Sequence, residues 1–148
     1  MEAVARAVTP PEMNPDSPRV LFRPKRIVIV DDSLLFSESW RAVVAARYGE
    51  KVQLETYQDP LKAIPHFGPG IDLLLIDLEM PVLDGRKLAA LAKERGVPCR
   101  RIVILSGHSA DELHRLFPPD SCLAVINKTE PQQQSAFLMI LDSVVRRP

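Results

Sequence analysis

The sequence predicts an α/β fold in which parallel strands form one sheet with helices on both faces. Segments of strand length alternate with segments of helical periodicity five times along the chain. The stretch Leu73–Ile76 is continuously apolar, as expected of a strand that helices bury on both faces. A length of 148 residues, with 46% hydrophobic and 26% charged residues, suits one globular domain with a substantial core.

Five segments are expected to form strands, and the second alternates more than the others, which places it nearer an edge of the sheet. In chain order these strands are Arg26–Val30, Val52–Tyr57, the stretch from Ile71 to Asp77, Arg101–Leu105 and Leu123–Ile126.

Each strand is followed by a signal for the start of a helix, either a capping side chain or a proline that suits the first turn. In chain order these signals are Ser33, Asp59-Pro60, Asp84 before Gly85, a capping box at Ser109–Glu112, and Glu130-Pro131, whose helix is expected to run to about Val145.

The composition narrows the classes of function. A net charge of zero gives no support for nucleic acid or an anionic membrane as a partner. Cys99 and Cys122 have no metal-ligand spacing and are not expected to form a disulfide. No apolar run reaches membrane-spanning length and no signal-peptide core is present, so a soluble cytoplasmic protein is expected.

Residues 1–24 contain five prolines and little periodicity, and are expected to form a flexible leader before a domain at 25–148. A docking peptide for a partner is the alternative for this segment.

Polar residues stand at the ends of four of the five strands: Asp31-Asp32, Asp77, Ser106 and Lys128. In an open α/β sheet, ligands bind outside the carboxyl ends of the strands. Three carboxylates in one crevice repel one another, and Mg²⁺ would relieve that repulsion. Lys128 and Ser106 suit phosphoryl oxygens. Together the residues predict a phosphoryl-transfer site whose product is an aspartyl phosphate on Asp77.

The pair Asp31-Asp32, the motif Asp77-Leu78-Glu79-Met80-Pro81-Val82-Leu83-Asp84-Gly85, Ser106-Gly107 and Lys128 together resemble the receiver domain of two-component response regulators. The resemblance extends from about Lys25 to Val145. It implies a flavodoxin-like (βα)5 fold with strand order 2-1-3-4-5.

The resemblance also implies roles for these residues. Asp77 would accept a phosphoryl group from a histidine kinase or histidine phosphotransfer protein. Asp32, Asp77 and the backbone carbonyl of Glu79 would bind Mg²⁺ directly, and Asp31 would act through water. Lys128 and Ser106 would contact phosphoryl oxygens, and the resulting surface change would reach a downstream effector protein.

Two positions depart from the usual receiver pattern. Thr129 replaces the proline that commonly follows the lysine, so the Lys128–Thr129 bond is expected to be either trans or a strained cis bond. Val125 stands where many receivers have Tyr or Phe, so an aromatic ring cannot be the switch. A Lys-Thr pair resembles receivers that often carry a helix-turn-helix output domain.

Several alternatives stay open. Glu79 and His108 either tune hydrolysis of the acyl phosphate or are solvent-facing loop residues. The wide apolar run Phe137–Leu141 either supports a homodimer or packs against neighbouring helices. The chain could instead be a phosphorylation-independent binding module or a receiver fragment of a longer DNA-binding regulator. An aspartyl-nucleophile phosphatase is disfavoured, because no second Asp follows Asp31 by two residues.

Overall fold

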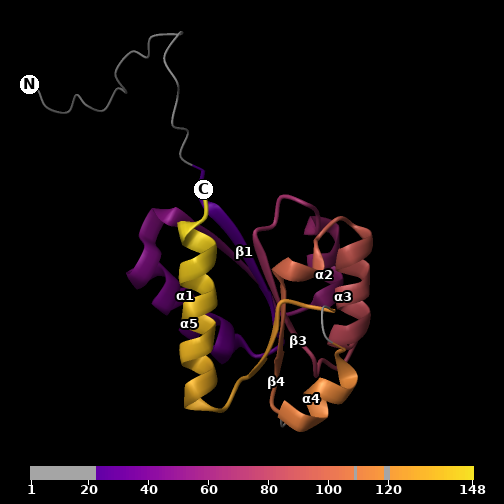
Figure 1. Cartoon of the computed structure of the whole chain (residues 1–148). Helices are drawn as coiled ribbons and strands as arrows, with labels where there is room; N and C mark the ends of the chain where they lie inside the picture. Colours follow the sequence, from indigo (N-terminus) through magenta and orange to yellow (C-terminus); the bar gives the residue numbers. More distant parts are fainter. Residues whose placement is uncertain (1–22, 109, 119–120) are drawn as a thin grey trace, which may run out of the picture.

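A computed structural model of the protein describes residues 23–108, 110–118 and 121–148, and it has one sheet of five parallel strands (Figure 1). The strands are β1 Lys25–Val30, β2 Val52–Tyr57, β3 Leu73–Asp77, β4 Ile102–Ser106 and β5 Ala124–Asn127. The sheet order is β2-β1-β3-β4-β5, which confirms the predicted flavodoxin-like topology and the edge position of β2. The predicted strand limits differ from the observed ones by at most two residues at each end.

In the described residues one α-helix follows each strand: α1 Leu34–Tyr48, α2 Pro60–Ala63, α3 Gly85–Glu94, α4 Ala110–Leu116 and α5 Pro131–Arg146. The caps form as predicted for the first three helices. Ser33 Oγ accepts from the N–H of Phe36, and Asp59 Oδ1 accepts from that of Leu61. The cap predicted at Ser109 lies outside the described residues, as does the predicted leader apart from Arg23 and Pro24.

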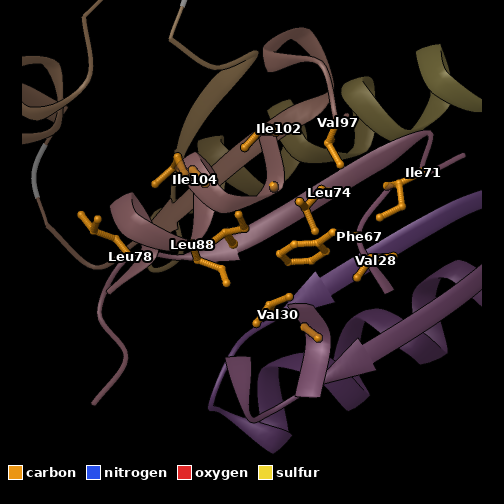
Figure 2. Close-up of a cluster of buried hydrophobic side chains, with 14 of the residues drawn as sticks. Val28, Val30, Phe67, Ile71, Leu74, Leu78, Leu88, Val97, Ile102 and Ile104 are labelled. Atoms are coloured by element: carbon orange, nitrogen blue, oxygen red, sulfur yellow. The ribbon is translucent and has the colours of Figure 1, made fainter. Parts of the chain in front are cut away.

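The sheet separates two apolar cores, because alternate residues of each strand point to opposite faces. On one face, Val28, Leu74 and Ile104 pack with residues of α3 such as Leu88 (Figure 2). On the other face, the neighbouring strand residues pack with Trp40 of α1 and Phe137 of α5. Figure 1 shows this division, with α1 and α5 on one side of the sheet and α2, α3 and α4 on the other.

Helices α1 and α5 are also joined by a polar contact at their surface. The guanidinium of Arg47 donates two hydrogen bonds to the Asp142 carboxylate, at 3.0 and 2.9 Å, and Tyr48 Oη donates a third at 2.6 Å. Burial and this carboxylate together raise the pKa of Tyr48 to about 12.

The structure bears on the predictions for the two cysteines and for membrane-spanning segments. Cys99 and Cys122 are both free thiols, as predicted. Within the described part of the chain, no helix combines the length and the apolar character needed to cross a bilayer.

Candidate functional site

The carboxyl ends of four strands bring the predicted polar residues to one edge of the sheet. Asp31 directly follows β1, Asp77 and Ser106 end β3 and β4, and Lys128 directly follows β5. Asp31 and Ser106 are fully buried and Asp77 is 2% exposed. Burying an unpaired polar group lowers the stability of a fold. These buried groups are therefore expected to have partners within the cluster.

Three carboxylates form the acidic part of the site. Oxygen atoms of Asp31, Asp32 and Asp77 lie within 4.8 Å of one another, and the Asp32 residue is exposed. Backbone groups orient two of them: Ser33 N–H donates to Asp31 Oδ1 at 2.8 Å, and Glu79 N–H donates to Asp77 Oδ1 at 3.2 Å. An all-oxygen set of like charges with one member open to solvent suits a hard cation such as Mg²⁺.

Lys128 supplies the positive charge of the site. Its Nζ lies 2.7 Å from Asp31 Oδ2 and 3.7 Å from Asp77 Oδ2. The same ammonium lies 4.7 Å from the centre of the Phe36 ring, so an aromatic face of α1 covers it. The Lys128 ammonium therefore lies between the buried carboxylates of Asp31 and Asp77.

The pKa of Asp77 is raised to about 8. Burial is the largest cause, the Asp31 carboxylate adds to it, and the Lys128 ammonium opposes both. A carboxyl group with this pKa is mostly protonated at neutral pH. A divalent cation among these oxygens would favour the ionised form, which is also the nucleophilic form.

The Asp84-Gly85 pair at the end of the predicted motif has a structural basis. Asp84 Oδ1 caps α3 by accepting from the N–H groups of Arg86 and Lys87. A Cβ atom on Gly85 would lie 2.6 Å from the backbone oxygen of Asp77 and 2.7 Å from Cα of Leu78. Only glycine therefore lets α3 begin directly against the end of β3.

The Glu79 side chain has a role that the sequence left open. Its Oε2 accepts a 2.6 Å hydrogen bond from Ser106 Oγ, and its Oε1 accepts a 3.1 Å bond from Gly107 N–H. His108 Nε2 lies 3.5 Å from the same carboxylate, and His108 N–H donates to Ser106 Oγ. Both residues are exposed, yet each also contacts its neighbours in this loop cluster, so the two readings of Glu79 and His108 stay open. Its backbone carbonyl as a metal ligand stays a prediction.

Sequence reasoning missed Asn127, the last residue of β5. Its Nδ2 donates to the His108 carbonyl at 3.0 Å, and its Oδ1 accepts from both the N–H and the hydroxyl of Thr129. Asn127 thus ties the loop after β4 to the loop after β5. The available signal was an amide residue at the end of an apolar strand, directly before Lys128.

The departures from the receiver pattern are resolved in part. The Lys128–Thr129 bond is trans, since the described residues contain no cis peptide bond. Val125 is half-buried and packs against the core that α3 covers.

The apolar run Phe137–Leu141 of α5 packs mostly inward. Its two end residues are buried, Leu138 and Ile140 are half-buried, and Met139 is 71% exposed. Homodimerisation through this helix stays a prediction.

Comparison with known sequences agrees with these features. Residues 27–134 match the family described as the response regulator receiver domain. A curated relative is protein-glutamate methylesterase/protein-glutamine glutaminase 5 of Anaeromyxobacter dehalogenans (strain 2CP-C), which is 37% identical over 81 residues. That match covers 51% of this chain and spans 22% of the relative.

Solved structures share the fold. The signal receiver domain of an HD domain-containing protein from Pseudomonas fluorescens Pf-5 has a TM-score of 0.65 at 18% identity, covering 88% of this chain and 92% of that one. A CheY-like receiver domain protein from Methanospirillum hungatei JF-1 gives 0.64 at 21%, covering 82% and 94%. The response regulator domain of Thermotoga maritima CheB gives 0.59 at 20%, also covering 82% and 94%.

Proposed function

The chain belongs to the response regulator receiver domain family, and from this premise we propose that Asp77 is its phosphoacceptor. One observation carries the proposal above all. Asp77 is a nearly buried carboxylate at the end of the central strand, 3.7 Å from a lysine ammonium and grouped with two further carboxylates. Burial and neighbouring charge also shift the pKa of Asp77 upward, and shifted pKa values of this kind cluster at functional sites.

The proposed donor is the phosphohistidine of a histidine kinase or histidine phosphotransfer protein. A carboxylate oxygen of Asp77 forms a bond to phosphorus as the phosphorus–nitrogen bond of the donor breaks, and the electron pair of that bond returns to the imidazole nitrogen. The Lys128 ammonium neutralises charge on a phosphoryl oxygen. The Ser106 hydroxyl donates a hydrogen bond to another.

The residues present fit Mg²⁺ as the cofactor. Asp32 and Asp77 are the proposed direct ligands, together with the backbone carbonyl of Glu79, and Asp31 is proposed to act through water. When bound, the cation supplies positive charge for the phosphoryl oxygens and favours the ionised form of Asp77.

Output is proposed to pass to a downstream effector protein through a change in the loop after β4. This loop leads into α4, and Asn127 connects it to the loop before α5. The alternative function, a binding module that works without phosphorylation, uses the same fold and predicts no covalent change.

Intact-mass measurement after incubation with acetyl phosphate and Mg²⁺ tests the proposal. We expect a gain of one phosphoryl group that disappears in Asp77→Asn and when a chelator removes Mg²⁺. Asp84→Asn is the matched control, because it alters another carboxylate of the same motif that caps α3. No mass gain in a wild-type chain that still binds Mg²⁺ would favour the binding-module alternative.

A further inference from the structure

The two carboxylate oxygens of Glu79 contact two adjacent donors at the end of β4. Ser106 Oγ donates to Oε2 at 2.6 Å and Gly107 N–H donates to Oε1 at 3.1 Å. The contact spans two loops whose residues are far apart in sequence, yet the Glu79 side chain remains 41% exposed. The Glu79 carboxylate thus accepts two charge-assisted hydrogen bonds although water can reach it.

A hydroxyl and a neighbouring backbone N–H form a small anion-binding pair. Carboxylate and phosphoryl groups both present two oxygens to such donors. We propose that Glu79 is an internal competitor that occupies these donors in the resting chain and must release them before Ser106 can contact a phosphoryl group on Asp77. This inference rests on the proposed function of Asp77.

The two states exclude each other because of the valence of the hydroxyl. A serine hydroxyl has one proton to donate. In the resting chain that proton points to Glu79, while the oxygen accepts from His108 N–H at 2.9 Å. Ser106 therefore cannot donate to a phosphoryl oxygen without losing Glu79.

Charge works in the same direction. A phosphoryl group adds about 1.5 to 2 negative charges near neutral pH. Glu79 follows Asp77 by two residues, and its own N–H donates to Asp77 Oδ1. Phosphorylation of Asp77 would therefore repel the Glu79 carboxylate while attracting the donors that Glu79 holds.

Release of Ser106 has a route to the rest of the molecule. Ser106 Oγ accepts from the N–H of His108, and the carbonyl of His108 accepts from Asn127 Nδ2. The N–H of Asn127 in turn donates to Gln133 Oε1 of α5 at 3.4 Å. Movement of Ser106 therefore acts on the backbone of His108 and, through Asn127, on the start of α5. This route requires no aromatic side chain at position 125.

Beryllium fluoride, a phosphoryl mimic, provides the test. Its dissociation constant in Mg²⁺ is measured from the fluorescence of Trp40, the single tryptophan, which packs on Phe36 beneath Lys128. We expect Glu79→Ala to tighten binding by about tenfold, the size of one charge-assisted hydrogen bond. Glu79→Gln, which keeps one acceptor oxygen, should give a smaller gain, and the dissociation constant for Mg²⁺ alone should change less than that for beryllium fluoride.

A double mutant separates competition for the donors from a simple effect of charge. In a Ser106→Ala background, Glu79→Ala should tighten binding by less than about threefold, because one contested donor is gone. Glu130→Gln removes a carboxylate at the start of α5 and should leave the dissociation constant unchanged. Equal gains from Ala and Gln at position 79 that persist in the Ser106→Ala background would overturn the proposal.

A second measurement needs no phosphoryl mimic. In the resting chain, the amide resonance of Gly107 should shift and its hydrogen exchange should accelerate in Glu79→Ala, with no such change in Glu130→Gln. An unchanged Gly107 amide would refute the competition. Failure of every variant to bind beryllium fluoride, together with a shifted Gly107 amide, would count against the phosphoacceptor role and leave the Glu79 contact established.

Discussion

The short ion pair of Lys128 is with Asp31, at 2.7 Å, and the proposed nucleophile is the more distant carboxylate. Asp31 is fully buried, and this ammonium is its counter-charge. The lysine thus stabilises the acidic cluster in the resting chain, and its distance to Asp77 leaves that carboxylate available to react.

Lys128→Met should therefore destabilise the fold in the absence of Mg²⁺. Removing the ammonium leaves buried carboxylates without a counter-charge, a change that typically costs about 3–5 kcal/mol. Urea unfolding should show a larger loss of stability at pH 8 than at pH 5, because Asp77 is protonated at pH 5 and no longer repels Asp31. Lys87→Met, at an exposed position of α3, is the control. Equal effects of the two substitutions would contradict the ion-pair argument.

The raised pKa of Asp77 predicts a stability that falls with rising pH. The folded chain retains the Asp77 proton up to a pKa of about 8, whereas the unfolded chain releases it near pH 4. The stabilisation is therefore complete below pH 4 and is lost as pH rises through 8. Without Mg²⁺, Asp77→Asn should be more stable than wild type at pH 8 by about 2–4 kcal/mol.

Thermal unfolding of the wild type and of Asp77→Asn between pH 5 and pH 8 measures this difference in stability. Added Mg²⁺ should stabilise the wild type more at pH 8 than at pH 5, since the cation binds the ionised carboxylate. A wild-type chain whose pH dependence matches that of Asp77→Asn would show that Asp77 has an ordinary pKa.

Gly85→Ala should be strongly destabilising. The added methyl would meet backbone atoms of Asp77 and Leu78 at 2.6 and 2.7 Å, and backbone cannot rotate away as a side chain can. We expect a loss of about 2–4 kcal/mol in denaturant unfolding, at or above the usual range for overpacking. Gly68→Ala has open space around the new Cβ and should change stability by less than about 1 kcal/mol.

Asn127→Ala should lower stability by about 1–3 kcal/mol, because it removes the part-buried hydrogen bonds to the carbonyl of His108 and from the N–H of Thr129. Thr129→Val removes a single bond to Asn127 and should cost less than about 1 kcal/mol. Chemical unfolding of both variants makes the comparison. A smaller loss for Asn127→Ala than for Thr129→Val would show that Asn127 does not hold the two loops together.

The strand ends were predictable from sequence for a geometric reason. In a parallel sheet the residue that follows each apolar segment lies at one common edge, so the sequence alone placed Asp77, Ser106 and Lys128 together. Local signals such as the Ser33 and Asp84 caps were equally accessible, because each involves residues two or three positions apart.

The hydrogen bonds of Glu79 and Asn127 could not be predicted from the sequence. The bond from Ser106 to Glu79 joins residues 27 positions apart, and that from Asn127 to His108 joins residues 19 apart. Each depends on the path of a loop and on one side-chain rotamer. The trans Lys128–Thr129 bond likewise depended on tertiary context, since the sequence left two geometries open.

The alternation of β3 between two cores limits where the chain can lengthen during evolution. Leu74 and Ile76 face one core, and Leu73 and Leu75 face the other. One residue inserted inside this strand would exchange the two faces and displace Asp77 by about 3.3 Å along the sheet. Insertions in related sequences should therefore accumulate at the opposite end of the sheet, in connections such as the one around Gly68. An extra residue there does not change which side chains of a strand face each core.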